Sequence, residues 1–296
     1  GVNQLLQGLG GDFGTLFCGM AFLHVGFTGT ICRIFEFTDN GTSQVSLQHL
    51  ADGRLQVLRG NVTILGTTTF VLPYAVWAYI EMKVVFSNTG SVEVRVNGTT
   101  VLLLASVDTT QSANNSANMF AIGPTQTVGN QIRCDDVYVI DNTIVDAANP
   151  LNDFLGDVRF KTQLPSAAGV TTDFGVVGAA SNFDAVNDVA SGDDTKYVFA
   201  DTVAKRDTYE ISDVASNDTI KTVQICHLAR KSDAGVATLK PVVISGGTTD
   251  VPALGQPVTN TYNYIRTNKA LDPDGSVVWT PTKFNAAKIG QEFAIV

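Results

Sequence analysis

The stretch 92–104, VEVRVNGTTVLLL, constrains the fold more than any other part of the chain. Apolar and polar side chains alternate on both sides of Asn97-Gly98, with the period of a strand that has one buried face. An Asn-Gly pair favours a two-residue type I′ turn, because both turn positions need a positive φ. The pattern predicts a hairpin with the cross-strand pairs Val96–Thr99, Val94–Val101 and Val92–Leu103.

The preceding segment 77–86, WAYIEMKVVF, alternates in the same way and predicts a third strand. A loop over 87–91 would give the pairs Phe86–Val92, Val84–Val94 and Met82–Val96. This register places Lys83 opposite Arg95, a repulsion that Glu81 and Glu93 on the diagonals would offset.

Turn signals recur at short intervals elsewhere in the chain, at Asp39-Asn40-Gly41, Asp52-Gly53 and Asp141-Asn142. Apolar residues make up 44% of the chain and charged residues 16%, a balance that fills a core and argues against disorder. Short strands between tight turns predict an all-β fold of antiparallel sandwiches.

A chain of 296 residues suits two domains. The polar stretch 141–154, which contains Pro150, interrupts the strand rhythm, so we expect a jelly-roll domain over 1–148 and a second domain over 149–296. The second half predicts a smaller β-sandwich with a short helix near its C-terminus. In that helix Thr280 is the cap, Pro281 the first residue and Gly290 the terminator.

The charge pattern excludes several classes of partner. The net charge is −9 and no basic cluster occurs, which argues against nucleic-acid binding. No apolar run reaches the roughly 20 residues of a membrane span, and the first residues lack the pattern of a signal peptide. The four cysteines have no C-x-x-C spacing, so we expect four buried thiols; a Cys18–Cys134 or Cys32–Cys134 bridge is the alternative.

The order of motifs in residues 10–141 is similar to the concanavalin A-like jelly rolls of the laminin G and pentraxin type. The residues that carry the resemblance are Trp77, Asn97-Gly98, Ile122-Gly123 and Asp135-Asp136. In the second half, FLGDVRF, DDTKYVFAD and DPDGSVVWTPTKFNAAKIGQEF resemble a β module of tailed-bacteriophage structural proteins. That resemblance implies a virion component.

Catalytic patterns are weak in this sequence. The carboxylate pairs Glu36/Asp39 and Glu210/Asp213 have i, i+3 spacing, which puts the two members on opposite faces of a strand and not together as a glycosidase needs. The histidines are His24, His49 and His227, and no G-x-S-x-G elbow accompanies them. We interpret them as packed or edge side chains.

Two kinds of binding site stay open. Laminin G-like domains often hold calcium at the sandwich rim, and the available carboxylates are Asp39, Asp52, Asp108, Asp135 and Asp136. Turn formation explains Asp39 and Asp52, and the strand pattern explains Asp135 and Asp136. Lectin sites in this fold use an aromatic platform, for which Tyr74, Trp77 and Tyr79 are candidates, although we expect Trp77 and Trp279 to be packed.

The sequence therefore predicts no catalytic, cofactor-binding or metal-ligating residues, with calcium as the one alternative. The predicted function is that of a non-enzymatic bacteriophage structural protein on the virion exterior, as a head decoration, head fibre or tail component assembled in the host cytoplasm. It would form homo-oligomers and dock on other virion proteins. The alternatives are a lectin-like adhesin that binds host-surface glycans and, third, a glycoside hydrolase.

Overall fold

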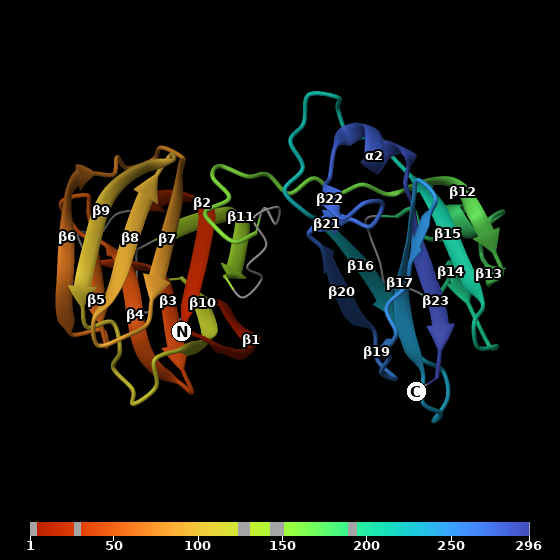
Figure 1. The fold of residues 1–296 in the computed structure, drawn as a ribbon, viewed down its shortest axis with the longest axis horizontal. Helices are drawn as coiled ribbons and strands as arrows, with labels where there is room; N and C mark the ends of the chain where they lie inside the picture. Colours follow the sequence, from red (N-terminus) through yellow and green to blue (C-terminus); the bar gives the residue numbers. More distant parts are fainter. Residues whose placement is uncertain (1–4, 27–30, 124–130, 143–150, 189–193, 296) are drawn as a thin grey trace. The chain divides into compact units, whose positions relative to one another are not determined.

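The computed structural model describes residues 5–26, 31–123, 131–142, 151–188 and 194–295 (Figure 1). The described chain forms two compact units. The first unit contains the described residues up to 142 together with 151–160, and the second unit contains 161–295. The expected boundary between residues 148 and 149 lies outside the described residues. No helix in the described ranges is long and apolar enough to cross a membrane.

The first unit is a sandwich of two antiparallel sheets (Figure 1). One sheet has the order β1-β10-β3-β4-β5-β6 and the other the order β11-β2-β7-β8-β9. The strands are β1 (Leu5–Phe13), β2 (Thr15–Gly26), β3 (Cys32–Asp39), β4 (Thr42–His49), β5 (Arg54–Arg59), β6 (Thr63–Val71), β7 (Ala78–Val85), β8 (Gly90–Val96), β9 (Thr99–Val107), β10 (Ala117–Ile122) and β11 (Gln131–Asp141). The predicted all-β sandwich fold is confirmed.

The core of this unit lies between the two sheets, because each strand turns alternate side chains inward. Phe37 and Leu47 of the first sheet and Ile80, Met82 and Val94 of the second are fully buried in one cluster. The alternation seen in the sequence therefore marks the buried face correctly.

The predicted register between β7 and β8 is wrong by two residues. The observed pairs are Val84–Val92, Met82–Val94 and Ile80–Val96. The observed register sets Lys83 opposite Glu93 and Glu81 opposite Arg95. Opposite charges thus face each other where the predicted register placed two cations together, which explains why the observed register is favoured.

The hairpin at Asn97-Gly98 begins as predicted, with Val96 opposite Thr99, and both turn residues have positive φ, 49° and 77°. Beyond Arg95 the register shifts, and Val94 pairs with Leu102 rather than with Val101. The extra residue is a β-bulge at Val101. The predicted pairs Val94–Val101 and Val92–Leu103 are therefore wrong.

The second unit is built on one larger sheet with the order β12-β15-β23-β17-β18, in which β19 also pairs with β17. Its elements are β12 (Pro165–Thr172), β13 (Gly175–Val177), α1 (Asn182–Ala185), β14 (Tyr197–Phe199), β15 (Arg206–Ile211), β16 (Val223–Ala229), β17 (Thr238–Ser245), β18 (Thr248–Asp250), β19 (Gln256–Pro257), β20 (Asn263–Lys269), β21 (Leu271–Asp272), β22 (Val277–Val278), α2 (Pro281–Ala286) and β23 (Lys288–Ala294). The β16–β20 pair contributes Val223 and Ile225 to a core shared with Val243 and Ile289 of the larger sheet.

The predicted C-terminal helix is present but ends earlier than expected. Pro281 is its first residue, and the Thr280 hydroxyl accepts a hydrogen bond from the Lys283 backbone N–H, as a cap does. The helix ends at Ala286, and Gly290 lies within β23. The predicted burial of Trp279 is confirmed, since its side chain is 3% exposed.

All four cysteines are free thiols, so neither bridge forms. Cys18 and Cys32 are buried as predicted, and burial raises the pKa of Cys32 to about 12. Cys134 and Cys226 are exposed, contrary to the prediction. Cys134 lies on β11, an edge strand of its sheet, where fewer neighbours cover a side chain.

Candidate functional site

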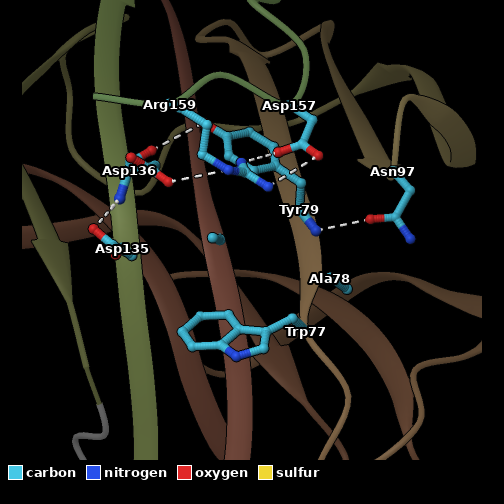
Figure 2. A pocket seen from close by; sticks show the side chains of 9 residues that line it. Trp77, Ala78, Tyr79, Asn97, Asp135, Asp136, Asp157 and Arg159 are labelled. Atoms are coloured by element: carbon cyan, nitrogen blue, oxygen red, sulfur yellow. Dashed lines mark hydrogen bonds and ion pairs between the residues drawn. The ribbon is translucent and has the colours of Figure 1, made fainter. Parts of the chain in front are cut away.

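A pocket of about 270 Å³ opens on the first unit, on the face of the β11-β2-β7 sheet that points away from the core (Figure 2). Its lining residues are Ala21, Trp77, Ala78, Tyr79, Asn97, Asp135, Asp136, Asp157 and Arg159. They come from β2, β7 and β11, from Trp77 just before β7, from the β8–β9 turn and from the segment 151–160 that follows the sandwich strands.

A small residue in the middle strand makes room for the pocket. Ala21 on β2 pairs with Tyr79 on β7 and with Asp135 on β11. A methyl group therefore lies between two larger side chains in one row across the sheet. Ala21 is 9% exposed, and its small side chain leaves room at the pocket that a large residue would take up.

Trp77 stands at one end of the pocket, and the polar group around Arg159 stands at the other (Figure 2). The indole is 49% exposed, so the prediction that Trp77 is packed was wrong. In the alternation of this segment the even-numbered residues Ile80 and Met82 face the core. Trp77 shares its parity with Tyr79 and so points outward, a signal that was already present in the sequence.

A β-bulge in β11 brings two consecutive carboxylates to the pocket. Asp135 pairs with Ala21 and Tyr138 pairs with Gly19, so two residues of β11 oppose one residue of β2. Asp136 has a φ of 51° at this bulge. In a regular strand the two aspartates would point to opposite faces, and the bulge re-aims one of them. The strand pattern alone therefore does not explain Asp135 and Asp136.

The backbone and side chain of Asp136 are both held by hydrogen bonds. Its carbonyl accepts from the Tyr79 hydroxyl at 2.9 Å, and its Oδ1 accepts from the Phe160 backbone N–H at 2.7 Å. Oδ2 forms an ion pair with Nε of Arg159 at 3.6 Å. Burial and then the Glu81 carboxylate raise the pKa of Tyr79, so its phenol stays a donor at neutral pH.

The segment 151–160 lies on the outer face of the sheet and supplies Asp157 and Arg159. Oε1 of the buried Glu81 accepts hydrogen bonds from the Gly156 backbone N–H at 2.9 Å and from the Tyr138 hydroxyl at 2.6 Å. The Arg95 guanidinium lies 4.0 Å from the ring centroid of Phe154. These contacts fix the segment on the sheet. Its role was not predicted, because the expected second domain began at residue 149 and included these residues.

Asn97 presents an amide group at the pocket (Figure 2). Its Oδ1 accepts from the Tyr79 backbone N–H at 2.8 Å, and its own backbone N–H donates to the Tyr79 carbonyl at 2.8 Å. Because Oδ1 already accepts a hydrogen bond from the protein, the exposed Nδ2 amide group is the one that can donate to a ligand.

The other candidate calcium ligands have structural partners and lie outside the pocket. Oδ2 of the buried Asp39 accepts from the Ser112 hydroxyl at 2.6 Å. Asp52 pairs with Arg54 within its turn, and Asp108 pairs with Arg59. Within the residues that the structure describes, no three His, Cys, Asp or Glu side chains are grouped as metal ligands.

The carboxylates Glu36 and Glu210, whose i, i+3 pairs the sequence argued against as catalytic, have structural partners. Glu36 is 6% exposed and accepts from Nη1 of Arg33 at 2.9 Å, while Glu210 pairs with Lys288 at 3.2 Å. The expected packing of histidines is confirmed for His24 and His49, which are buried with their Nδ1 atoms 2.9 Å apart.

Comparisons with known proteins concern the fold. No protein-family model matches this sequence, and no curated protein matches it. Similar solved structures include an endo-β-1,4-glucuronan lyase from the fungus Trichoderma reesei, with a TM-score of 0.39 and 18% identity over 47% of this chain and 73% of that chain. A sialidase has a TM-score of 0.36 and 12% identity over 47% of this chain and 14% of its own. The alginate lyase AlgAT5 has a TM-score of 0.32 and 15% identity over 43% of this chain and 58% of its own.

These comparisons correct the predicted function. The expected non-enzymatic virion protein is contradicted, because the similar structures named here are lyases and a sialidase and none is a phage component. These structures have jelly-roll β-sandwich folds, which is consistent with the concanavalin A-like resemblance. The chain spans less than two thirds of the sialidase and of the alginate lyase AlgAT5. Self-association and location stay predictions.

Proposed function

We propose that the first unit binds carbohydrate in the pocket between Trp77 and Arg159. The observation that carries the proposal is the half-exposed Trp77 indole at one end of a pocket whose other end holds a row of hydrogen-bonding groups. The proposal corresponds to the lectin-like alternative, for which Trp77 and Tyr79 were candidate platform residues; the polar residues of the pocket were not predicted as sugar ligands.

The two ends of the pocket match the two kinds of surface on a sugar ring. The C–H groups of a pyranose form an apolar face, which packs on an aromatic ring that is partly exposed to solvent. Its hydroxyl groups lie around the edge and need both acceptors and donors. The carboxylates of Asp135 and Asp157 supply acceptors, and Nδ2 of Asn97 supplies a donor.

The size and rigidity of the pocket suit a small ligand. Its volume of about 270 Å³ lies just below the range of roughly 300–1,000 Å³ that is typical of small-molecule sites. The polar groups at its edge are fixed before a ligand arrives, because Asn97 is hydrogen-bonded to the Tyr79 backbone and Asp136 to the Phe160 backbone. Preorganisation of this kind lowers the entropy cost of binding.

The test is a glycan-array screen of the full chain followed by calorimetry on the best oligosaccharide. Trp77→Ala should weaken binding by about tenfold or more, because it removes the aromatic platform. Ala21→Phe should block the pocket by filling the room between Tyr79 and Asp135. The matched control is Leu103→Ala, which removes a side chain that is 66% exposed on β9 of the same unit and does not line the pocket.

Two results would overturn the proposal. One is the absence of binding across neutral, amino, uronic and sialic sugars. The other is binding that Trp77→Ala and Ala21→Phe leave at the level of Leu103→Ala, which would place the sugar elsewhere on the chain.

A further inference from the structure

The pocket carries an excess of negative charge. Asp135, Asp136 and Asp157 line it together with a single cation, Arg159. Three aspartates and one arginine give the lining a formal charge of −2.

The one cation is already engaged by protein groups. The Arg159 guanidinium pairs with the Asp157 carboxylate, its Nη1 donates to the Val158 carbonyl at 2.9 Å, and its Nε lies 3.6 Å from Oδ2 of Asp136. The hydrogen bond with Asp157 raises the pKa of Arg159 above its ordinary value, so the guanidinium stays charged and bound to its neighbours. An incoming carboxylate would have to compete with Asp157 and Asp136 for these donors.

From this charge arrangement we infer that the site takes an uncharged sugar and discriminates against uronic and sialic acids. The inference rests on the proposed carbohydrate binding and specifies its ligand class. Sugar hydroxyls donate to aspartate oxygens, so a neutral pyranose satisfies the carboxylates. A sugar carboxylate has no proton to donate at neutral pH and would add a further like charge within the same small volume.

Asp135 is the carboxylate best placed to accept from a neutral ligand. Its Oδ1 accepts from the Asp136 backbone N–H at 2.8 Å. Among the described residues the structure shows no hydrogen-bond partner for its Oδ2, and the side chain is exposed at the pocket. This oxygen can therefore accept a hydrogen bond from a sugar hydroxyl, whereas it would repel an anionic ligand.

The experiment compares maltose, cellobiose and lactose with glucuronate disaccharides and sialyllactose, by calorimetry on the full chain at low and high salt. The strongest neutral sugar should bind at least about tenfold more tightly than any acidic one at low salt. High salt should narrow this ratio by weakening the repulsion, and it should leave the affinity for the neutral sugar nearly unchanged.

A charge variant sharpens the comparison. Asp157→Asn removes one negative charge and releases Arg159, so it should raise the affinity for the glucuronate probe relative to the neutral probe by about three- to tenfold. The matched control is Asp153→Asn, which removes the same charge from an exposed residue of the same segment outside the pocket. That control should leave the ratio unchanged.

The possible outcomes distinguish a failure of the inferred sugar class from a failure of the proposed carbohydrate site. Acidic sugars that bind as tightly as neutral ones or more tightly, at a site abolished by Trp77→Ala, would overturn the inference and leave the carbohydrate site standing. A ratio that Asp157→Asn and Asp153→Asn change equally would also overturn it. Absence of binding to every probe would remove the proposed function and the inference together.

Discussion

The Tyr138 hydroxyl donates a hydrogen bond to Oε1 of Glu81 at 2.6 Å, on the outer face of the β11-β2-β7 sheet. Glu81 is 1% exposed and Tyr138 is 5% exposed. The same carboxylate oxygen accepts from the Gly156 backbone N–H at 2.9 Å, so one buried acid joins two strands to the segment 151–160. Asp157 and Arg159 follow directly after this anchor and line the pocket. The buried contact therefore sets the geometry of the exposed site.

Tyr138→Phe should loosen this anchor without changing the charge of the pocket. Glu81 would lose a hydrogen bond in a buried position, and we expect the free energy of unfolding of the first unit to fall by about 1–3 kcal/mol. Faster proteolysis within 151–160 and weaker sugar binding should accompany the loss. Chemical denaturation, limited proteolysis and calorimetry measure the three effects.

Tyr209→Phe is the matched control for that variant. Tyr209 is also a buried tyrosine with a carboxylate partner, since its hydroxyl donates to Oδ2 of Asp207 at 3.0 Å, but it belongs to the second unit. It should destabilise that unit and leave sugar binding intact. Equal loss of sugar affinity in both variants would show that Glu81 and Tyr138 do not position the pocket in particular.

The buried pair His24 and His49 makes the first unit sensitive to acid. Burial, and then the neighbouring His24, lower the pKa of His49 to about 4. The unfolded chain has a histidine pKa of about 6.5, so the unfolded state binds more protons between these two values. The free energy of unfolding should therefore be highest above pH 6.5 and fall as the pH decreases toward 4, by on the order of 2–3 kcal/mol in total.

Urea denaturation at a series of pH values measures this slope. His49→Gln should flatten it for the first unit, because the titrating group is removed. Trp279→Phe leaves Trp77 as the one tryptophan, so fluorescence in that background reports the first unit. An unchanged slope in His49→Gln would assign the acid sensitivity to other groups.

The sequence predicts the inward face of the first sandwich well and its registers poorly. Alternation identifies Met82 and Val94 as core residues, because burial repeats with period two. A slip of two residues between β7 and β8 preserves that alternation, so hydrophobicity cannot choose between the two registers. The facing charges Lys83 and Glu93 decide the register, and the bulge at Val101 has no comparable signal in the alternation.

The candidate site was partly readable from the sequence. Trp77 follows the same parity as Tyr79, so its outward direction was implied by the alternation that placed Ile80 in the core. Asp135-Asp136 is visible as a motif in the sequence, but a regular strand would separate the two side chains, and the local sequence does not encode the bulge at Asp136. The segment that carries Arg159 is held on the sheet by the hydrogen bond from the Gly156 backbone N–H to Glu81, a long-range contact that no local pattern in the sequence encodes.

Gly290→Ala should destabilise the second unit strongly. β23 and β15 approach so closely that a Cβ at Gly290 would lie 1.9 Å from the Asp207 carbonyl oxygen and 2.7 Å from the Thr208 Cα. Backbone atoms cannot move aside as a flexible side chain can, so we expect a loss of about 2–4 kcal/mol in the free energy of unfolding. The control is Gly247→Ala, where a Cβ would meet nothing within 4 Å. Sugar binding by the first unit should survive in both variants, and a Gly290→Ala variant as stable as Gly247→Ala would refute the close approach.

Asn97→Asp isolates the donor at the pocket from the turn that carries it. An aspartate retains the oxygen that accepts from the Tyr79 backbone N–H and tolerates the positive φ of 49°. It lacks the Nδ2 amine, so a neutral sugar should bind about three- to tenfold more weakly while the free energy of unfolding changes by less than about 1 kcal/mol. Calorimetry with the best neutral oligosaccharide measures the affinity, and urea denaturation measures the free energy of unfolding. Unchanged affinity in a stable variant would mean that Asn97 serves the β8–β9 turn alone and does not donate to the sugar.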